Sequence, residues 1–183
     1  MLAPLNTDER ERLLAAMAEI EQLIRTATIE VDVVSPNSAA TRRCLAAYFR
    51  ELAARFEGGF NPREGDPASE EEMTPPNGFF VLARIDGRVV GCGGLRRIDK
   101  RVGEIKRMWT TPEGRGQGVA RRVLHKLEAL AREAGIETLR LDTNRVLLEA
   151  QAMYRRNGYR EIARYNDNPY AHHWFEKALK PIA

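Results

Sequence analysis

The sequence predicts an α/β protein with an α+β layout, and three observations lead to that prediction. After an N-terminal helix, apolar periodicity indicates a strand, a helix, three strands, a helix, a strand, a helix and a closing pair of strands. Asp86-Gly87 joins two of these strands and is a strong short hairpin signal, so the two are antiparallel neighbours. The chain has 183 residues, 43% of them hydrophobic, which suits one globular domain with its own core.

Composition excludes several classes of protein. The net charge of +3 is a near balance of 29 basic and 26 acidic residues, which does not favour a nucleic-acid partner. Cys44 and Cys92 lack paired spacing, so we expect neither a disulfide framework nor a zinc site, and the natural compartment is a reducing cytoplasm. No apolar run reaches about 18 residues and no signal-peptide core is present, so we expect a soluble, unexported protein without a membrane partner.

The chain begins with an amphipathic helix over residues 7–25, with Thr7 as its N-cap. Its apolar residues recur at helical spacing: Leu13, Leu14, Met17, Ile20, Leu23 and Ile24. We expect residues 1–26 to form an appendage, which packs on its own domain or on a partner and could support a homodimer. Residues 27–183 are then the main domain.

A strand over residues 28–34 and a helix over residues 39–56 open the main domain. The helix has one apolar face, formed by Leu45, Tyr48, Phe49, Leu52 and Phe56. Residues 57–78 contain four Pro and four Gly and read as a long loop. Two interpretations of this loop stay open, a mobile wall of a substrate site and solvated disorder.

The predicted hairpin strands are residues 79–85 and 88–95, and a third antiparallel strand covers residues 103–110. Gly91, Gly93 and Gly94 in the second strand indicate a bulge or a close approach of another backbone. The remaining elements are a helix over 116–134, a strand over 138–143, a helix over 147–156 and strands over 159–163 and 172–177.

The turn between residues 114 and 120, of sequence GRGQGVA, follows a strand and opens a helix. Unpaired N–H groups and the dipole at a helix N-terminus bind phosphate, and glycines let the backbone come close. Arg115, Arg121 and Arg122 add positive charge that suits a diphosphate. The spacing matches neither the dinucleotide fingerprint nor the Walker loop, but it fits R-x-x-G-x-A through Arg115, Gly118 and Ala120.

This motif resembles the pyrophosphate-binding motif of the GNAT (Gcn5-related N-acetyltransferase) superfamily, and the resemblance extends over residues 79–179. Residues 103–112 resemble the fourth strand of the family, Thr143-Asn144 resembles the end of the fifth, and Tyr154 to Tyr159 match its Y-x-x-x-G-F/Y signature. The resemblance implies a central mixed, mostly antiparallel sheet flanked by helices. The first helix also resembles, over about twenty residues, the last helix of MarR-type regulators.

The resemblance further implies that acetyl-CoA is the co-substrate and that no metal is required. It assigns cofactor binding to one set of residues: Met108, Trp109, Thr110, Arg115, Gly116, Gln117, Gly118, Val119, Ala120, Arg121, Asn144 and Ala150. The backbone of Met108 and Trp109 would pair with the pantetheine arm, and the Met108 N–H would stabilise the oxyanion.

Two catalytic residues follow from the same resemblance. Glu104 is the candidate base, acting directly or through water, and a surface ion pair is its alternative role. Tyr154 is the candidate acid, because a phenol with a pKa of about 10 can protonate a departing thiolate. His172 and His173 are adjacent on a strand and point to opposite faces, so we expect no metal site there.

The sequence thus predicts an acetyl-CoA-dependent N-acetyltransferase that acts directly on a primary amine of a small molecule, such as an amino acid, an amine or an antibiotic. Three alternatives stay open. The chain could bind acyl-CoA as a regulator without catalysis, acetylate protein amines, or bind nucleic acid through the arginines of the turn, and the modest net charge disfavours the last.

Overall fold

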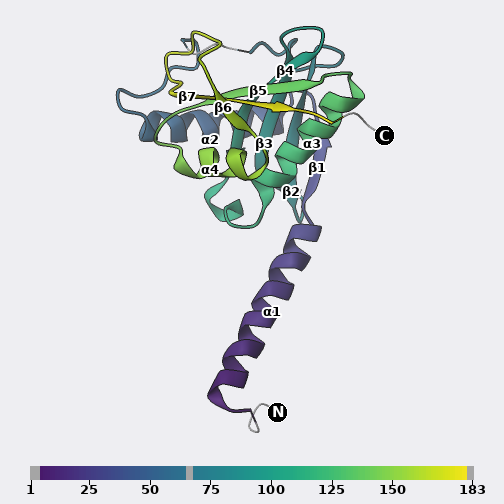
Figure 1. Ribbon diagram of the computed structural model, residues 1–183, viewed down its shortest axis with the longest axis vertical. Helices are drawn as coiled ribbons and strands as arrows, with labels where there is room; N and C mark the ends of the chain where they lie inside the picture. Colours follow the sequence, from purple (N-terminus) through teal and green to yellow (C-terminus); the bar gives the residue numbers. More distant parts are fainter. Residues whose placement is uncertain (1–4, 65–67, 181–183) are drawn as a thin grey trace.

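The computed structural model describes residues 5–64 and 68–180, which form a twisted sheet with helices on both faces (Figure 1). The helices and strands, in chain order, are α1 (Thr7–Ala27), β1 (Glu30–Val33), α2 (Ala39–Arg55), β2 (Gly78–Ile85), β3 (Arg88–Arg97), β4 (Val102–Thr110), a 3₁₀ turn η1 (Pro112–Gly114), α3 (Val119–Glu133), β5 (Thr138–Thr143), α4 (Leu148–Arg156), β6 (Arg160–Ile162) and β7 (His173–Ala178). The predicted order of elements is confirmed, with boundaries shifted by one to three residues.

The seven strands lie in the order β1-β2-β3-β4-β5-β7-β6, and every neighbouring pair is antiparallel except β4 and β5. Asp86 and Gly87 turn the β2–β3 hairpin with φ values of 49° and 73°, as its tight turn requires. The predicted mixed, mostly antiparallel sheet flanked by helices is therefore confirmed.

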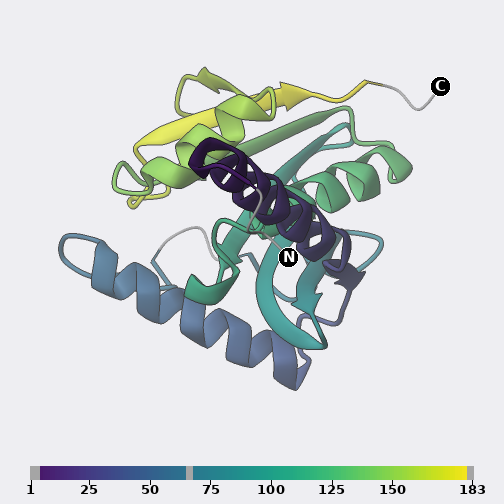
Figure 2. The same ribbon diagram turned by 90° about the horizontal axis from the view of Figure 1, so that it is seen from below.

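Side chains on β2 alternate between two cores, one on each face of the sheet. Val81 and Ala83 belong to the larger core, which α3 covers, whereas Phe80 and Leu82 belong to a smaller core beside α2. Figure 2 shows α2 on one side of the sheet and α3 and α4 on the other. The apolar stripe of α3 supplies much of the larger core through buried residues that include Val123, Leu124 and Leu127.

The glycines of β3 allow this close packing. A Cβ atom at Gly93 would lie 2.7 Å from a methyl of Val123 on α3, and one at Gly94 would lie 2.6 Å from the sulfur of Met73 on the other face. A side chain at either position would therefore displace a packed neighbour. These close neighbours are side chains rather than a second backbone, and the β3–β4 register shifts between Cys92 and Gly94, so of the two predicted alternatives the bulge is confirmed.

The parallel pairing of β4 with β5 is short. Its register covers only three pairs, which end at Glu104 with Arg140. Beyond this point β4 carries a bulge, where Arg107 adopts a left-handed φ of 57°, and Arg107 has no cross-strand partner in the β3–β4 register. The two central strands therefore separate toward their C-terminal ends, and the separation leaves room for a site.

Helix α1 projects away from the sheet (Figure 1). Asn6, rather than the predicted Thr7, is its N-cap: the Asn6 side chain accepts from the Glu9 N–H at 2.9 Å, and Glu9 accepts from the Asn6 N–H at the same distance. Its apolar side chains are exposed: Leu14 and Leu23 to 63%, Met17 and Ile20 to 57%. None of the described residues therefore packs over this apolar face of α1. The domain boundary after residue 26 stays a prediction.

The described part of the 57–78 loop packs against the domain. Met73 is fully buried and Ala68 nearly so, in the same core cluster as Cys44 and Cys92. Of the two open interpretations, solvated disorder does not fit these residues. The cluster also joins the two cysteines, which are distant in sequence and remain free thiols. Among the described helices, none is long and apolar enough to cross a bilayer.

Candidate active site

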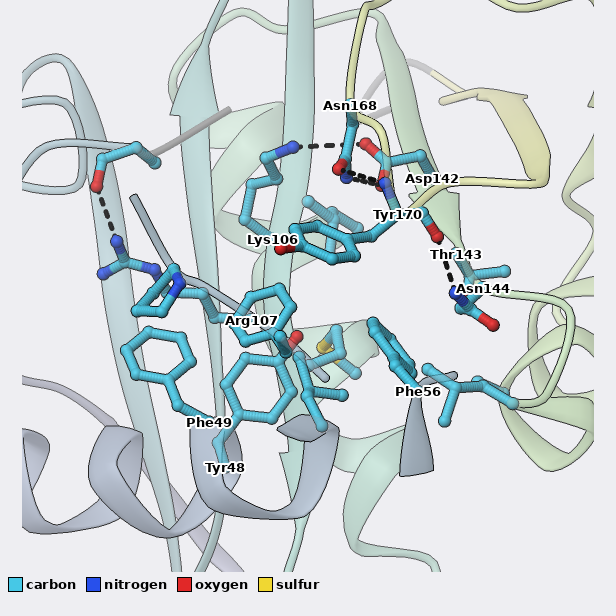
Figure 3. A pocket seen from close by; sticks show the side chains of 18 of the residues that line it. Tyr48, Phe49, Phe56, Lys106, Arg107, Asp142, Thr143, Asn144, Asn168 and Tyr170 are labelled. Carbon is cyan, nitrogen blue, oxygen red and sulfur yellow. Dashed lines mark hydrogen bonds and ion pairs between the residues drawn. The ribbon is translucent and has the colours of Figure 1, made fainter. Parts of the chain in front are cut away.

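Two connected cavities lie where β4 and β5 separate. The larger, of about 420 Å³, is a groove between the N-terminus of α3, α2 and α4, and we call it the cofactor groove. The smaller, of about 120 Å³, is lined by α2, by β4 and β5 and by the loops that contain Phe60 and Tyr170, and we call it the acceptor cavity (Figure 3). Six residues line both: Tyr48, Leu52, Met108, Leu147, Ala150 and Tyr154. These shared residues mark the junction at which two bound molecules would meet.

The cofactor groove gathers most of the residues that the sequence assigned to cofactor binding. Those that line it are Met108, Trp109, Thr110, Arg115, Gly116, Gly118, Val119, Ala120, Arg121 and Ala150. Gly116 and Gly118 have left-handed φ values of 76° and 80°, which only glycine adopts freely, and Gly118 caps α3 without a side chain. The first amides of α3 are therefore open to an anion.

Two predicted cofactor residues lie elsewhere. The amide of Gln117 donates to the Glu113 carbonyl at 2.6 Å, and Gln117 does not line the groove. Asn144 lines the acceptor cavity instead, where its amide donates to the Tyr170 carbonyl at 2.8 Å and its oxygen accepts from the Val146 N–H. These contacts give Asn144 a loop-fixing role after β5.

Charge in the groove is balanced by Glu51 of α2, which sequence reasoning did not single out. Arg115 contacts Glu51 at 2.5 Å, and the indole N–H of Trp109 donates to its other oxygen at 2.8 Å. These hydrogen bonds outweigh the cost of partial burial and lower the pKa of Glu51. Thr110 also lines the groove, and among the described residues no group bonds its buried hydroxyl.

Tyr154 stands at the junction of the two cavities and is only 4% exposed. Burial, together with the negative charge of Asp142, raises its pKa above the ordinary phenol value. Tyr48 on α2 shares the junction, and burial and the same charge raise its pKa as well. Both phenols therefore stay protonated at neutral pH and are available as hydrogen-bond donors.

Glu104 lines neither the cofactor groove nor the acceptor cavity, and it is 1% exposed. Its carboxylate contacts Arg96 at 2.6 Å, accepts from the Tyr165 hydroxyl at 2.7 Å and from Asn166 at 3.1 Å, and lies 3.4 Å from Lys106 Nζ. The sequence placed this residue as a base facing the acceptor. That role stays a prediction, and these contacts show that Glu104 reaches the acceptor cavity only behind Lys106.

Asp142 on β5 is the one carboxylate that lines the described acceptor cavity. It accepts from Lys106 at 3.1 Å, Asn168 at 2.7 Å and Asn166 at 2.8 Å. Figure 3 shows Lys106, Asn168 and Asp142 grouped at one side of the cavity. Glu104, Lys106 and Asp142 therefore form a continuous row of buried ion pairs in which negative and positive charges alternate.

Arg107 lies on the opposite side of the acceptor cavity from Asp142 (Figure 3). In a regular strand Lys106 and Arg107 would point to opposite faces, and the bulge in β4 turns both toward one cavity. Sequence reasoning missed Arg107 and Asp142 because the glycines of β3 indicated a bulge without showing which β4 side chain it turns, and separated strands leave no pattern in the sequence. The apolar face of α2 was predicted, but as packing rather than as a cavity wall.

Comparisons with known proteins cover the part of the chain that contains most of these site residues. The family model for the acetyltransferase (GNAT) family matches residues 45–159. The chain is 36% identical over 108 residues to an IAA acetyltransferase of Azospirillum brasilense, covering 57% of this chain and 70% of the relative. It is 33% identical over 112 residues to the aminoalkylphosphonate N-acetyltransferase of Salmonella typhimurium, covering 58% and 67%.

A solved structure shares the fold. It is a GNAT family acetyltransferase from Elizabethkingia anophelis with acetyl-CoA bound, with a TM-score of 0.59 and 15% identity, covering 83% of this chain and 99% of that one.

Proposed function

The chain belongs to the GNAT acetyltransferase family, and we propose that it transfers an acetyl group from acetyl-CoA to the primary amine of a small molecule. The observation that supports this proposal most directly is the pair of joined cavities with Tyr154 at their junction. One cavity suits a diphosphate carrier and the other a small acceptor, so the reacting groups of the two would meet beside one phenol.

Acetyl-CoA fits the residues of the cofactor groove. The open amides of α3, with Arg115 and Arg121, suit its diphosphate, and the unsatisfied hydroxyl of Thr110 lies along the same groove. When bound, acetyl-CoA supplies the acetyl group as a thioester. The crystal structure of the Elizabethkingia anophelis relative with acetyl-CoA bound supports the same choice.

The residues at the junction divide the work of acetyl transfer. The backbone N–H of Met108 donates to the carbonyl oxygen as it gains negative charge. Tyr154 donates its hydroxyl proton to the sulfur as it departs, and its raised pKa keeps that proton in place at neutral pH. Asp142 faces the amine across the acceptor cavity and accepts, directly or through water, the proton that the nitrogen loses on attack, while Glu104 fixes Lys106 beside it.

A small-molecule acceptor fits the enclosed form of the acceptor cavity, which the described loop residues Phe60, Pro62 and Ala68 close off from one side. The names of the two relatives, an IAA acetyltransferase and an aminoalkylphosphonate N-acetyltransferase, also refer to small molecules.

Thiol release from acetyl-CoA, measured with a panel of amines, tests the proposal. We expect Tyr154→Phe to lower kcat by about 10²-fold or more, the contribution typical of a general acid, without weakening acetyl-CoA binding. Tyr159→Phe is the matched control, since Tyr159 is a buried neighbour of Tyr154, with ring centroids 5.9 Å apart, and lines neither cavity.

The panel also separates the alternatives. A chain that binds acetyl-CoA and releases no thiol with any amine would be a regulator rather than an enzyme. Activity restricted to peptides or proteins would move the acceptor to protein amines. Equal turnover by Tyr154→Phe and the unmodified protein would remove Tyr154 from the mechanism.

A further inference from the structure

We infer that the acceptor is an α-amino acid with an apolar side chain, held as a zwitterion between Asp142 and Arg107. This inference rests on the proposed function and names the substrate class of the same site. It follows from three features of the acceptor cavity: a cation at one end, a carboxylate at the other and an aromatic wall between them.

Arg107 supplies the positive end. Its guanidinium donates to the Ala68 carbonyl at 2.6 Å and lies over the Phe49 ring, 5.9 Å from the centroid. Among the described residues, no carboxylate lies within ion-pair distance of it, although Glu70 is near enough to favour its charge. A half-buried guanidinium with donors to spare is a site for a carboxylate, which it can bind through two parallel hydrogen bonds.

The bulge in β4 indicates that this placement is built into the fold. Arg107 adopts a left-handed backbone conformation, with a φ of 57°, which is unfavourable for a residue with a Cβ atom. The Arg107 carbonyl accepts from the Cys92 thiol at 3.4 Å, which helps to hold the bulge. Such strain is common where a side chain must point into a site.

Asp142 supplies the negative end, next to the reacting junction. Its charge acts on both Tyr48 and Tyr154, so it lies close to the phenols between which the amine must react. Lys106, Asn166 and Asn168 hold it in place. An ammonium group at this end of the cavity would share the Asp142 carboxylate with Lys106, beside the phenols where acetyl transfer takes place.

The spacing of the two ends favours an α-amino acid over a longer molecule. Tyr48, Arg107 and Asp142 all line the same cavity, whose volume is about 120 Å³. Figure 3 shows Tyr48 below the space between Arg107 and Asp142. A cavity of this volume fits a carboxylate one carbon away from the amine better than a long spacer.

The aromatic wall of the acceptor cavity can accommodate an apolar side chain of the acceptor. Phe49, Phe56, Phe60 and Tyr170 form a chain of ring contacts, with centroids 4.8 to 5.9 Å apart. All four line the cavity together with Leu52. Burial of a hydrocarbon or aromatic side chain against these rings would add affinity without any further charge.

Matched acceptors test this inference. L-phenylalanine, L-leucine and L-methionine are each compared with the corresponding amide, which keeps the amine and side chain and lacks the carboxylate. The amide has the more readily deprotonated amine, so a preference for the acid must come from the protein. We expect kcat/KM to be at least 10-fold higher for the acids.

Arg107→Gln should lower kcat/KM for the acids by about 10- to 100-fold, the loss typical of one charge-assisted hydrogen-bonded pair, and leave the amides almost unchanged. Arg107→Lys should recover part of the difference. Arg84→Gln, on the outer strand pair where Arg84 contacts Asp32 at 3.5 Å, is the control. Thermal unfolding and acetyl-CoA binding of each variant show whether it is folded.

Each outcome bears on one proposal. Equal use of acids and amides, or an equal loss on both in Arg107→Gln, would overturn the zwitterion inference and leave acetyl transfer in place. The absence of thiol release with every amine would overturn the proposed function. Calorimetric binding of L-phenylalanine to the unmodified protein and to Arg107→Gln then still decides whether Arg107 holds a carboxylate.

Discussion

At the residue scale, Glu104 shows how burial changes the role of a side chain. Its carboxylate is 1% exposed and lies between Arg96, which also contacts Glu72, and Lys106, which also contacts Asp142. Removing one partner of a buried ion pair typically costs about 3–5 kcal/mol, because the remaining charge loses its compensation. These contacts give Glu104 a large share in stability whatever its part in catalysis.

We predict that Glu104→Gln lowers the free energy of unfolding by about 3 kcal/mol, measured by denaturant titration, because Arg96 and Lys106 lose their shared carboxylate. Glu72→Gln is the control, since Glu72 contacts the same arginine at 3.3 Å but is 43% exposed, and it should cost less than about 1 kcal/mol. The pH profile of kcat for folded Glu104→Gln should keep its shape. A profile that loses its acidic limb, with stability unchanged, would instead establish Glu104 as the base.

Local spacing made part of the site predictable at this scale. Gly118 and Arg115 lie within one turn, so their motif is visible in the sequence and the groove contains both. Arg107 and Asp142 are on different strands, and only the bulge and the separation of β4 from β5 bring them to one cavity. A single sequence therefore carries no local signal that Arg107 and Asp142 line the same cavity.

At the element scale, periodicity predicted where strands and helices form, but not how strands pair over part of their length. The alternating residues of β4 identified a strand, yet the bulge at Arg107 and the three-pair contact with β5 depend on what packs on each face. Helix α2 illustrates the same limit, because its predicted apolar face packs against the smaller core at Leu45 and lines the acceptor cavity at Tyr48 and Phe49.

Helix α1 presents an exposed apolar stripe that we expect to pair with α1 of a second copy. In an antiparallel pair, Leu14 would face Ile20 and the basic Arg12 would approach Glu19, so apolar contacts and opposite charges would both favour this arrangement. We predict that the combination Leu14→Glu and Ile20→Glu converts a dimer into a monomer in sedimentation equilibrium. Glu19→Gln with Arg12→Gln should weaken association less. A monomer at all concentrations for the unmodified chain would contradict the pairing.

At the scale of the whole molecule, titration of buried tyrosines should limit stability at high pH. Tyr154 and Tyr159 are 4% and 2% exposed, and burial raises the pKa of each above the ordinary phenol value. Above a pH of about 10, these phenols ionise in the unfolded chain while they remain protonated in the folded one. The unfolded state then binds fewer protons, so the free energy of unfolding falls as pH rises.

We predict a slope of about −1.4 kcal/mol per pH unit for each of these two phenols above pH 10, which denaturant unfolding between pH 9 and 11 would measure. Tyr159→Phe should remove one such contribution. The Tyr159 hydroxyl makes no hydrogen bond of normal geometry within the described residues, although the Glu128 carboxylate lies near it, so this variant should cost little stability at pH 8. Phe175→Leu, an apolar change in the same core, should lower stability at both pH values and keep the slope. A slope that Tyr159→Phe leaves unchanged would show that Tyr159 ionises as readily in the folded protein as in the unfolded chain.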